Sequence, residues 1–367
     1  MKKLLIIILV SLSFAGSRYC NNISQKERKT FIYIDKSSIK TDYYQHLIKK
    51  LKGTFLPHEQ VVVLSFNPET QNIKEVFNSC VPKLSKEEIE KIKEKGGLFL
   101  FSESPINKAK EDYQFFISAL KGVLKKIKPV EDIDNKQIVE MFYNESNRFE
   151  TPLNRVIIYS DMMENSEDFP LNKIIANKYS VKDFEEYKSN FNYSNIYVLL
   201  SEKKLKASKL RNLAYFWDNY FEYNKADLKN FNTELKLSKV SYLKNKIFSG
   251  KLIYPDDSFY RVKLLFNYTF NGKVVNAWFV INGIDAVPLD GKVYIRGMKL
   301  KKGYFKIITD KKFHVLTKTE KIEVNFKGKK AKGLIISENT NLEVITPKGN
   351  HFNNPKIIIE LKEEDEI

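Results

Sequence analysis

Short apolar runs alternate with stretches of helical spacing between residue 28 and about residue 230. The short runs are rich in β-branched and aromatic residues, as strands buried on both faces of a parallel sheet are. They are FIYI (31–34), VVVLSF (61–66), VIIYS (156–160) and NIYVLL (195–200). Apolar residues recur at helical spacing over 40–52, 107–128, 135–147 and 204–226. The alternation predicts an α/β domain, a parallel sheet flanked by helices.

The segment 67–101 departs from this alternation. NPETQ (67–71) is typical of a turn between two strands, so we expect a hairpin at the edge of the sheet. The charged stretch KLSKEEIEKIKEKGG (83–97) predicts a surface helix that ends at Gly96 and Gly97.

Helical spacing disappears after about residue 235, and short alternating runs recur roughly every ten residues. Turn signals such as NGK (271–273) and PKGN (347–350) separate these runs. The pattern predicts an antiparallel β-sandwich or a small barrel. We therefore expect an α/β domain over 28–235, an all-β domain over 236–362 and an acidic tail over 363–367.

The amino terminus, MKKLLIIILVSLSFAG, has two lysines, an apolar run and small residues near Ala15. It is typical of a secretory signal peptide over 1–15, followed by a leader segment over 16–27. The apolar run is too short for a membrane anchor, which needs about 20 residues. Lipid attachment at Cys20 requires small residues before the cysteine, and Arg18 and Tyr19 are not small. We expect an exported protein of the periplasm or cell envelope.

The two cysteines, Cys20 and Cys80, are the candidates for a disulfide in an oxidising compartment. The alternative is that Cys20 lies in a loose leader and Cys80 packs as a small buried hydrophobe. The sequence leaves both open.

The formal net charge is +17 and the pI is about 9.4, values that raise the question of nucleic-acid binding. The positive residues are mostly lysines spread through the chain, and clusters such as KKLK (203–206) and KGKKAKG (327–333) are short. This distribution favours a weak attraction to anionic envelope polymers and gives no support to specific nucleic-acid recognition.

Motifs of common enzymes are absent from the sequence. The four histidines show no HExxH spacing, the two cysteines form no CxxC, and neither a GxSxG elbow nor a glycine-rich phosphate loop occurs. We therefore expect a protein that is not an enzyme.

Oxygen-bearing side chains follow two of the predicted strands. Asp35, Ser37 and Ser38 follow the first strand, and Ser160 and Asp161 end the strand VIIYS. Because ligands of open α/β sheets bind at the carboxyl ends of strands, we expect these groups to converge. An all-oxygen set suits Mg²⁺.

These residues carry a resemblance to a known family. The pattern Asp35-x-Ser37 after a strand, with SDMMENS (160–166) after a later one, resembles the von Willebrand factor A (vWA) domain and its metal-ion-dependent adhesion site. The resemblance covers roughly 28–230 and is to a bacterial, exported or plasmid-associated branch of vWA-like proteins. The other segments that carry it are VFNSCVP (76–82), YS (179–180) and FWDNYF (216–221). It implies a Rossmann-like sheet, a protein partner at its carboxyl edge, and Mg²⁺ held by Asp35, Ser37 and Asp161.

The metal site that the resemblance implies is incomplete. Ile39 stands where the motif Asp-x-Ser-x-Ser has its second serine, and VEDIDN (130–135) stands where the family has a threonine. The weaker candidates for the missing ligands are Ser38, Asp132 and Asp134. Asp134 also has a simpler interpretation, as the N-cap of the helix that follows.

The sequence therefore predicts an exported protein-interaction module that binds its partner at the carboxyl edge of the vWA-like sheet, with or without Mg²⁺. One alternative is a structural component of an envelope assembly that has a vestigial metal site and makes its contacts through the β domain. A second is a phosphatase with Asp35 as nucleophile, but Ser37 occupies the position where such enzymes have a second aspartate.

Overall fold

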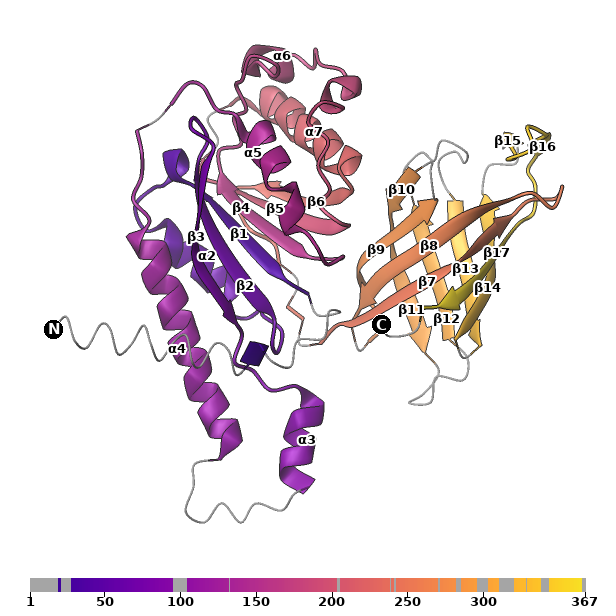
Figure 1. Cartoon of the computed structure of the whole chain (residues 1–367), viewed down its shortest axis with the longest axis horizontal. Coiled ribbons are helices and arrows are strands. Elements are labelled where there is room, and N and C mark those ends of the chain that lie inside the picture. Colours follow the sequence, from indigo (N-terminus) through magenta and orange to yellow (C-terminus); the bar gives the residue numbers. More distant parts are fainter. Residues whose placement is uncertain are drawn as a thin grey trace. The chain divides into compact units, whose positions relative to one another are not determined.

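The computed structural model of the chain divides into two compact units, one that ends at Tyr242 and one that begins at Leu243 (Figure 1). The sequence pattern placed this boundary after residue 235. The residues that the structure describes are 19–20, 28–94, 104–131, 133–202, 205–237, 239–240, 242–269, 271–281, 285–295, 303–309, 320–327, 329–337 and 343–364. The expected signal peptide, most of the leader, Gly96 and Gly97, Asp132 and the end of the acidic tail lie outside the described residues.

The first unit contains a six-stranded sheet (Figure 1). Its strands are β1 (Thr30–Asp35), β2 (Gln60–Asn67), β3 (Asn72–Cys80), β4 (Arg155–Ser160), β5 (Ser194–Leu200) and β6 (Ala226–Asn232). They lie in the order β3-β2-β1-β4-β5-β6, and all neighbours are parallel except β2 and β3, which form the expected edge hairpin. This is the order of a doubly wound, Rossmann-like sheet. The predicted α/β fold is confirmed.

The first unit has six helices in its described part. They are α2 (Tyr43–Leu51), α3 (Lys86–Glu94), α4 (Pro105–Lys126), α5 (Ile138–Asn144), α6 (Leu171–Ile175) and α7 (Ala207–Tyr223), with 3₁₀ turns η1 (Lys36–Ser38), η2 (Ser146–Arg148) and η3 (Val181–Phe184). Helices α2 and α4 cover one face of this sheet and α5, α6 and α7 the other, while α3 buries no residue. Ile32 and Ile34 of β1 pack in one core with α2 and α4. Phe31 and Tyr33 point to the other face and pack with α5, α6 and α7. The side chains of one strand therefore alternate between two cores, which explains why the run FIYI is apolar throughout.

Two expectations about this unit were wrong. The predicted helix over 204–226 ends earlier, at Tyr223, and the chain continues into the edge strand β6. The helix expected over 135–147 begins only at Ile138, with Gln137 rather than Asp134 at its N-cap. The physical reason is that the preceding residues are held in extended backbone, since Lys136 forms a β-bridge with Asn165 and the Gln137 amide bonds to the Pro68 carbonyl.

The second unit is an antiparallel sheet. Its strands are β7 (Lys244–Ile253), β8 (Phe259–Tyr268), β9 (Val274–Ile281), β10 (Asp285–Pro288), β11 (Asp290–Ile295), β12 (Gly303–Thr309), β13 (Glu320–Lys327), β14 (Lys330–Ser337) and β17 (Ile357–Glu363), with a separate hairpin of β15 (Glu343–Ile345) and β16 (His351–Asn353). Alternate residues of the strands form the core, for example Val262, Leu264 and Phe266 of β8. The predicted all-β domain is confirmed.

The two ends of this sheet meet. The Leu289 amide donates to the Ala277 carbonyl at 2.8 Å, and the Val293 amide donates to the Gly272 carbonyl at 2.7 Å. The segment formed by β10 and β11 thus bonds to the β9 side as well as to β12. Gly272 has φ +80, and a Cβ there would lie 1.9 Å from the Val293 carbonyl oxygen, so only glycine fits. Of the two architectures that the sequence left open, the backbone pairing is that of a barrel.

No helix among the described residues is long and apolar enough to cross a membrane.

Candidate functional site

The site lies at the carboxyl ends of β1 and β4, the neighbouring strands between which the strand order reverses. Asp35, the last residue of β1, is fully buried. Its Oδ1 accepts hydrogen bonds from the Ser37 amide at 2.9 Å and the Ser37 hydroxyl at 2.7 Å. Its Oδ2 accepts the hydroxyls of Ser38 and Ser160, both at 2.7 Å. A carboxylate has about four lone-pair positions, so the hydrogen-bonding capacity of Asp35 is filled by its own chain.

Two serines connect Asp35 to the end of β4. The Ser38 hydroxyl, which donates to Asp35, accepts the Asp161 amide at 3.0 Å. In the same way, the Ser160 hydroxyl accepts the Met162 amide at 2.9 Å. Each hydroxyl therefore joins the first loop to the second, and the two loops are locked into one arrangement.

Asp161, the second expected carboxylate, forms an ion pair within the protein. Its Oδ2 lies 2.8 Å from the Nζ of Lys136, and both side chains are almost completely buried. Its Oδ1 accepts the Met163 amide at 3.1 Å. Lys136 directly follows VEDIDN, the segment in which the family resemblance expected a threonine. A lysine ammonium thus supplies the positive charge beside this carboxylate.

Of the weaker candidates, Ser38 belongs to this network, as its two hydrogen bonds show, whereas Asp134 takes no part in it. Asp134 is exposed, and its backbone carbonyl accepts a hydrogen bond from the Asn165 side chain. Asp132 lies outside the described residues. Lys40, a lysine that flanks the site, forms an ion pair with Glu202 beyond the end of β5. Within the described part of the chain, no group of three or more histidine, cysteine, aspartate or glutamate side chains is placed to hold a metal ion.

The residues at this edge do not fit a Mg²⁺ ion that is open to a partner's carboxylate. Asp35 has its acceptor positions occupied, and the Lys136 ammonium already neutralises Asp161. A divalent cation beside Asp161 would lie within a few ångströms of that buried positive charge, an unfavourable arrangement. The two carboxylates and Ser160 are also shielded from solvent, with only Ser37 half-buried.

A third buried carboxylate near this edge was not predicted from the sequence. Glu164 is completely buried, and its Oε2 accepts the amides of Ile138 and Val139 at 2.6 and 2.9 Å, at the start of α5. Burial raises the pKa of Glu164 to about 7, although these hydrogen bonds oppose the rise. Glu164 therefore titrates near neutral pH.

Charged residues are also buried at the opposite, amino-terminal edge of the sheet. Glu59 accepts hydrogen bonds from Arg28 Nη2 at 2.9 Å and from Arg155 Nη2 at 3.0 Å. Burial lowers the pKa of Arg155 to about 10, while the charge of Glu59 opposes the change. Burial alone would raise the pKa of Glu59, but the two arginines hold it below its usual value.

A disulfide lies on the same side. Cys20 and Cys80 are bonded, so the structure has the paired state of the two that the sequence left open. The bond attaches residues 19–20 to the end of β3. The Tyr19 hydroxyl also donates to Asp112 of α4 at 2.8 Å.

No protein-family model matches this chain, and no curated protein matches it. Among solved structures, the chain is similar to a von Willebrand factor type A from Catenulispora acidiphila, at 9% sequence identity. The match covers 90% of this chain and 66% of that chain, with a TM-score of 0.25. This TM-score is too low for any property of that protein to be carried over to this one.

Proposed function

We propose that this chain is an exported binding protein that holds a protein partner at the carboxyl edge of its six-stranded sheet, without a bridging metal ion. The observation that carries the metal-free part of the proposal is the ion pair between Lys136 and Asp161, because it gives the buried carboxylate an internal cation. The partner then contacts the exposed polar groups around the network, among them Lys40 and Asp134.

The rigidity of the edge supports a binding role. The hydroxyls of Ser38 and Ser160 fix the two loops against Asp35 through hydrogen bonds of 2.7 Å. A surface that is ordered before binding loses less conformational entropy when the partner arrives. The disulfide supports export, because such bonds persist in oxidising compartments.

The burial of Asp35 favours binding over the phosphatase alternative. A nucleophile has to reach the phosphorus atom of its substrate, whereas the carboxylate of Asp35 is shielded from solvent and accepts four hydrogen bonds from its own chain.

Site-specific photo-crosslinking in cells that produce the protein tests this function. A photoreactive amino acid is placed at Lys36 or Lys40 on the edge, at Lys332 on the barrel, and at Lys93 on α3 as a control. We expect covalent adducts of one discrete size from the two edge positions and none from Lys93, with the same yield in EDTA.

Adducts that form only from Lys332 would contradict the proposal and favour the structural alternative, in which the β domain makes the contacts. Edge adducts that disappear on chelation would contradict the metal-free part of the proposal alone.

A further inference from the structure

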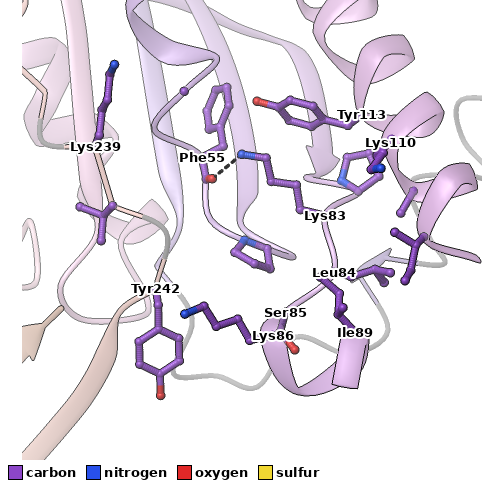
Figure 2. A pocket seen from close by; sticks show the side chains of 16 residues that line it. Phe55, Lys83, Leu84, Ser85, Lys86, Ile89, Lys110, Tyr113, Lys239 and Tyr242 are labelled. Carbon is purple, nitrogen blue, oxygen red and sulfur yellow. Dashed lines mark hydrogen bonds between the residues drawn. The ribbon is translucent and has the colours of Figure 1, made fainter. Parts of the chain in front are cut away.

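A pocket of about 530 Å³ lies at the amino-terminal edge of the six-stranded sheet, opposite the Asp35 site. The described residues that line it come from five parts of the first unit: the loop after α2, the connection from β3 to α3, the first turn of α3, the first turns of α4, and residues 239, 240 and 242 (Figure 2). Its volume is in the range of sites that enclose small molecules, about 300–1,000 Å³.

The walls of this pocket are mainly apolar, and its charges have one sign. The apolar contributions include those of Phe55, Leu84, Ile89, Ile106, Tyr113 and Val240. Among the described residues, the charged ones that line it are Lys83, Lys86, Lys110 and Lys239, and none of the lining residues is acidic. In Figure 2 the side chains of Lys83, from the β3–α3 connection, and Lys86, from the start of α3, extend across the pocket. Such a lining suits a ligand that has a hydrocarbon part and a negative charge.

Lys83 is the half-buried cation of this pocket. Its ammonium donates to the Phe55 carbonyl oxygen at 2.8 Å and lies 4.4 Å from the centre of the Tyr113 ring. Burial lowers the pKa of Lys83, and the charge of Glu59 opposes this change. Glu59 is itself paired with Arg28 and Arg155. A carboxylate in the pocket would therefore meet a cation that is only partly compensated.

The wall that carries Lys83 is held in place. The Val81 amide bonds to the Glu59 carbonyl at 2.9 Å, and the disulfide fixes Cys80. Ser85 and Glu88 cap α3 reciprocally, with amide-to-side-chain distances of 2.7 and 3.2 Å. The pocket thus exists before a ligand enters, which lowers the cost of binding.

We propose that this pocket binds a small amphiphilic carboxylate, with the carboxylate beside Lys83 and the hydrocarbon chain against the apolar walls. The ligand site is separate from the proposed partner edge, and neither depends on the other.

Calorimetric titration of the full mature protein with decanoate, below its micelle concentration, tests the proposal. 1-Decanol and decyltrimethylammonium are the matched probes, since they share the chain and differ in head-group charge. We expect decanoate to bind about tenfold or more tightly than decanol, and the cation not to bind. Lys83→Met should weaken the binding of decanoate by about tenfold or more and leave the binding of decanol unchanged. Lys83→Arg should retain decanoate binding.

Lys49→Met, on the exposed side of α2, is the control variant and should bind as the wild type does. Circular dichroism establishes that each variant is folded, and hydrogen exchange locates the ligand by protection of 82–89 and 105–113. Equal binding of decanoate and decanol, decanoate binding unchanged in Lys83→Met, or no binding of decanoate to the wild type would each overturn the proposal.

Discussion

Besides Asp35, three carboxylates of the first unit are buried, and each is stabilised in a different way. Asp161 pairs with a lysine, Glu59 pairs with two arginines, and Glu164 accepts hydrogen bonds from backbone amides. Burying a charge is costly unless the charge is paired. The partner of each carboxylate therefore determines how removal of that carboxylate changes the stability of the protein. The three positions therefore give different expected outcomes.

Glu59→Gln is expected to destabilise the protein strongly. The substitution leaves Arg28 and Arg155 buried without a counter-ion, a loss of about 3–5 kcal/mol in the free energy of unfolding. Urea unfolding followed by circular dichroism measures it. Glu90→Gln, at an exposed position of α3, is the control and should change stability by less than about 0.5 kcal/mol. A loss for Glu59→Gln as small as that of the control would mean that the arginines find other partners.

Glu164→Gln is expected to change the pH dependence of stability. The pKa of Glu164 is about 7 in the folded protein against 4.5 ordinarily, so the folded state binds the proton more tightly. Its contribution is fully present below pH 4.5 and is lost as the pH rises through about 7. The variant mimics the protonated form. Between pH 4 and pH 8 its free energy of unfolding should therefore rise by on the order of 3 kcal/mol relative to that of the wild type. Parallel stability curves for the two proteins would contradict this expectation.

Among the elements of the first unit, four strands were predicted from their apolar runs, and all four are buried on both faces, whereas the edge strand β3 was predicted from its turn. β1, β2, β4 and β5 read as continuous apolar runs because both of their faces pack against helices. β6 was missed because only part of this edge strand is buried and it carries polar residues such as Lys229 and Asn230. The hydrophobic pattern of a strand reflects how much of the strand is buried. An edge strand such as β6 is less buried, so its pattern is weaker.

The same limit applies to the candidate site. Asp35, Ser38 and Asp161 could be brought together from the sequence, because the carboxyl ends of adjacent parallel strands meet. The sequence could not place Lys136 at this site, because Lys136 follows a loop and not a strand. Only the fold shows that its ammonium reaches Asp161. The one feature of the sequence that could have indicated this role of Lys136 is its position, directly after the segment where the family has a metal ligand.

The disulfide between Cys20 and Cys80 attaches an amino-terminal segment to β3 across 60 residues of chain. Reduction, or Cys80→Ser, is expected to lower the free energy of unfolding by about 2–4 kcal/mol, since the open chain has more unfolded conformations. Thermal melting with and without a reducing agent measures this, and the Cys80→Ser variant should not respond to the reductant. An unchanged melting temperature on complete reduction would show that the bond contributes nothing to stability.

At the scale of the whole molecule, the chain consists of two units that each have a core of their own. A unit with its own core is expected to fold alone. Fragments 19–242 and 243–367 should each unfold cooperatively in urea. A fragment that shows no cooperative transition would mean that its fold depends on the other unit.

We propose that the Lys136 ammonium takes the place of a metal ion at the carboxyl edge of the sheet, because it pairs with Asp161. The most direct test is the melting temperature of residues 16–367 in EDTA and in millimolar Mg²⁺, for the wild type, Asp35→Ala and Lys136→Ala. We expect no effect of Mg²⁺ on the wild type, and a lower melting temperature for Lys136→Ala, which leaves Asp161 buried without its cation. A bound ion at about 100 times its dissociation constant would add roughly 2.7 kcal/mol, a readily visible shift. A rise in the melting temperature of the wild type that Asp35→Ala abolishes would show this proposal to be wrong, because Asp35 would then be a metal ligand.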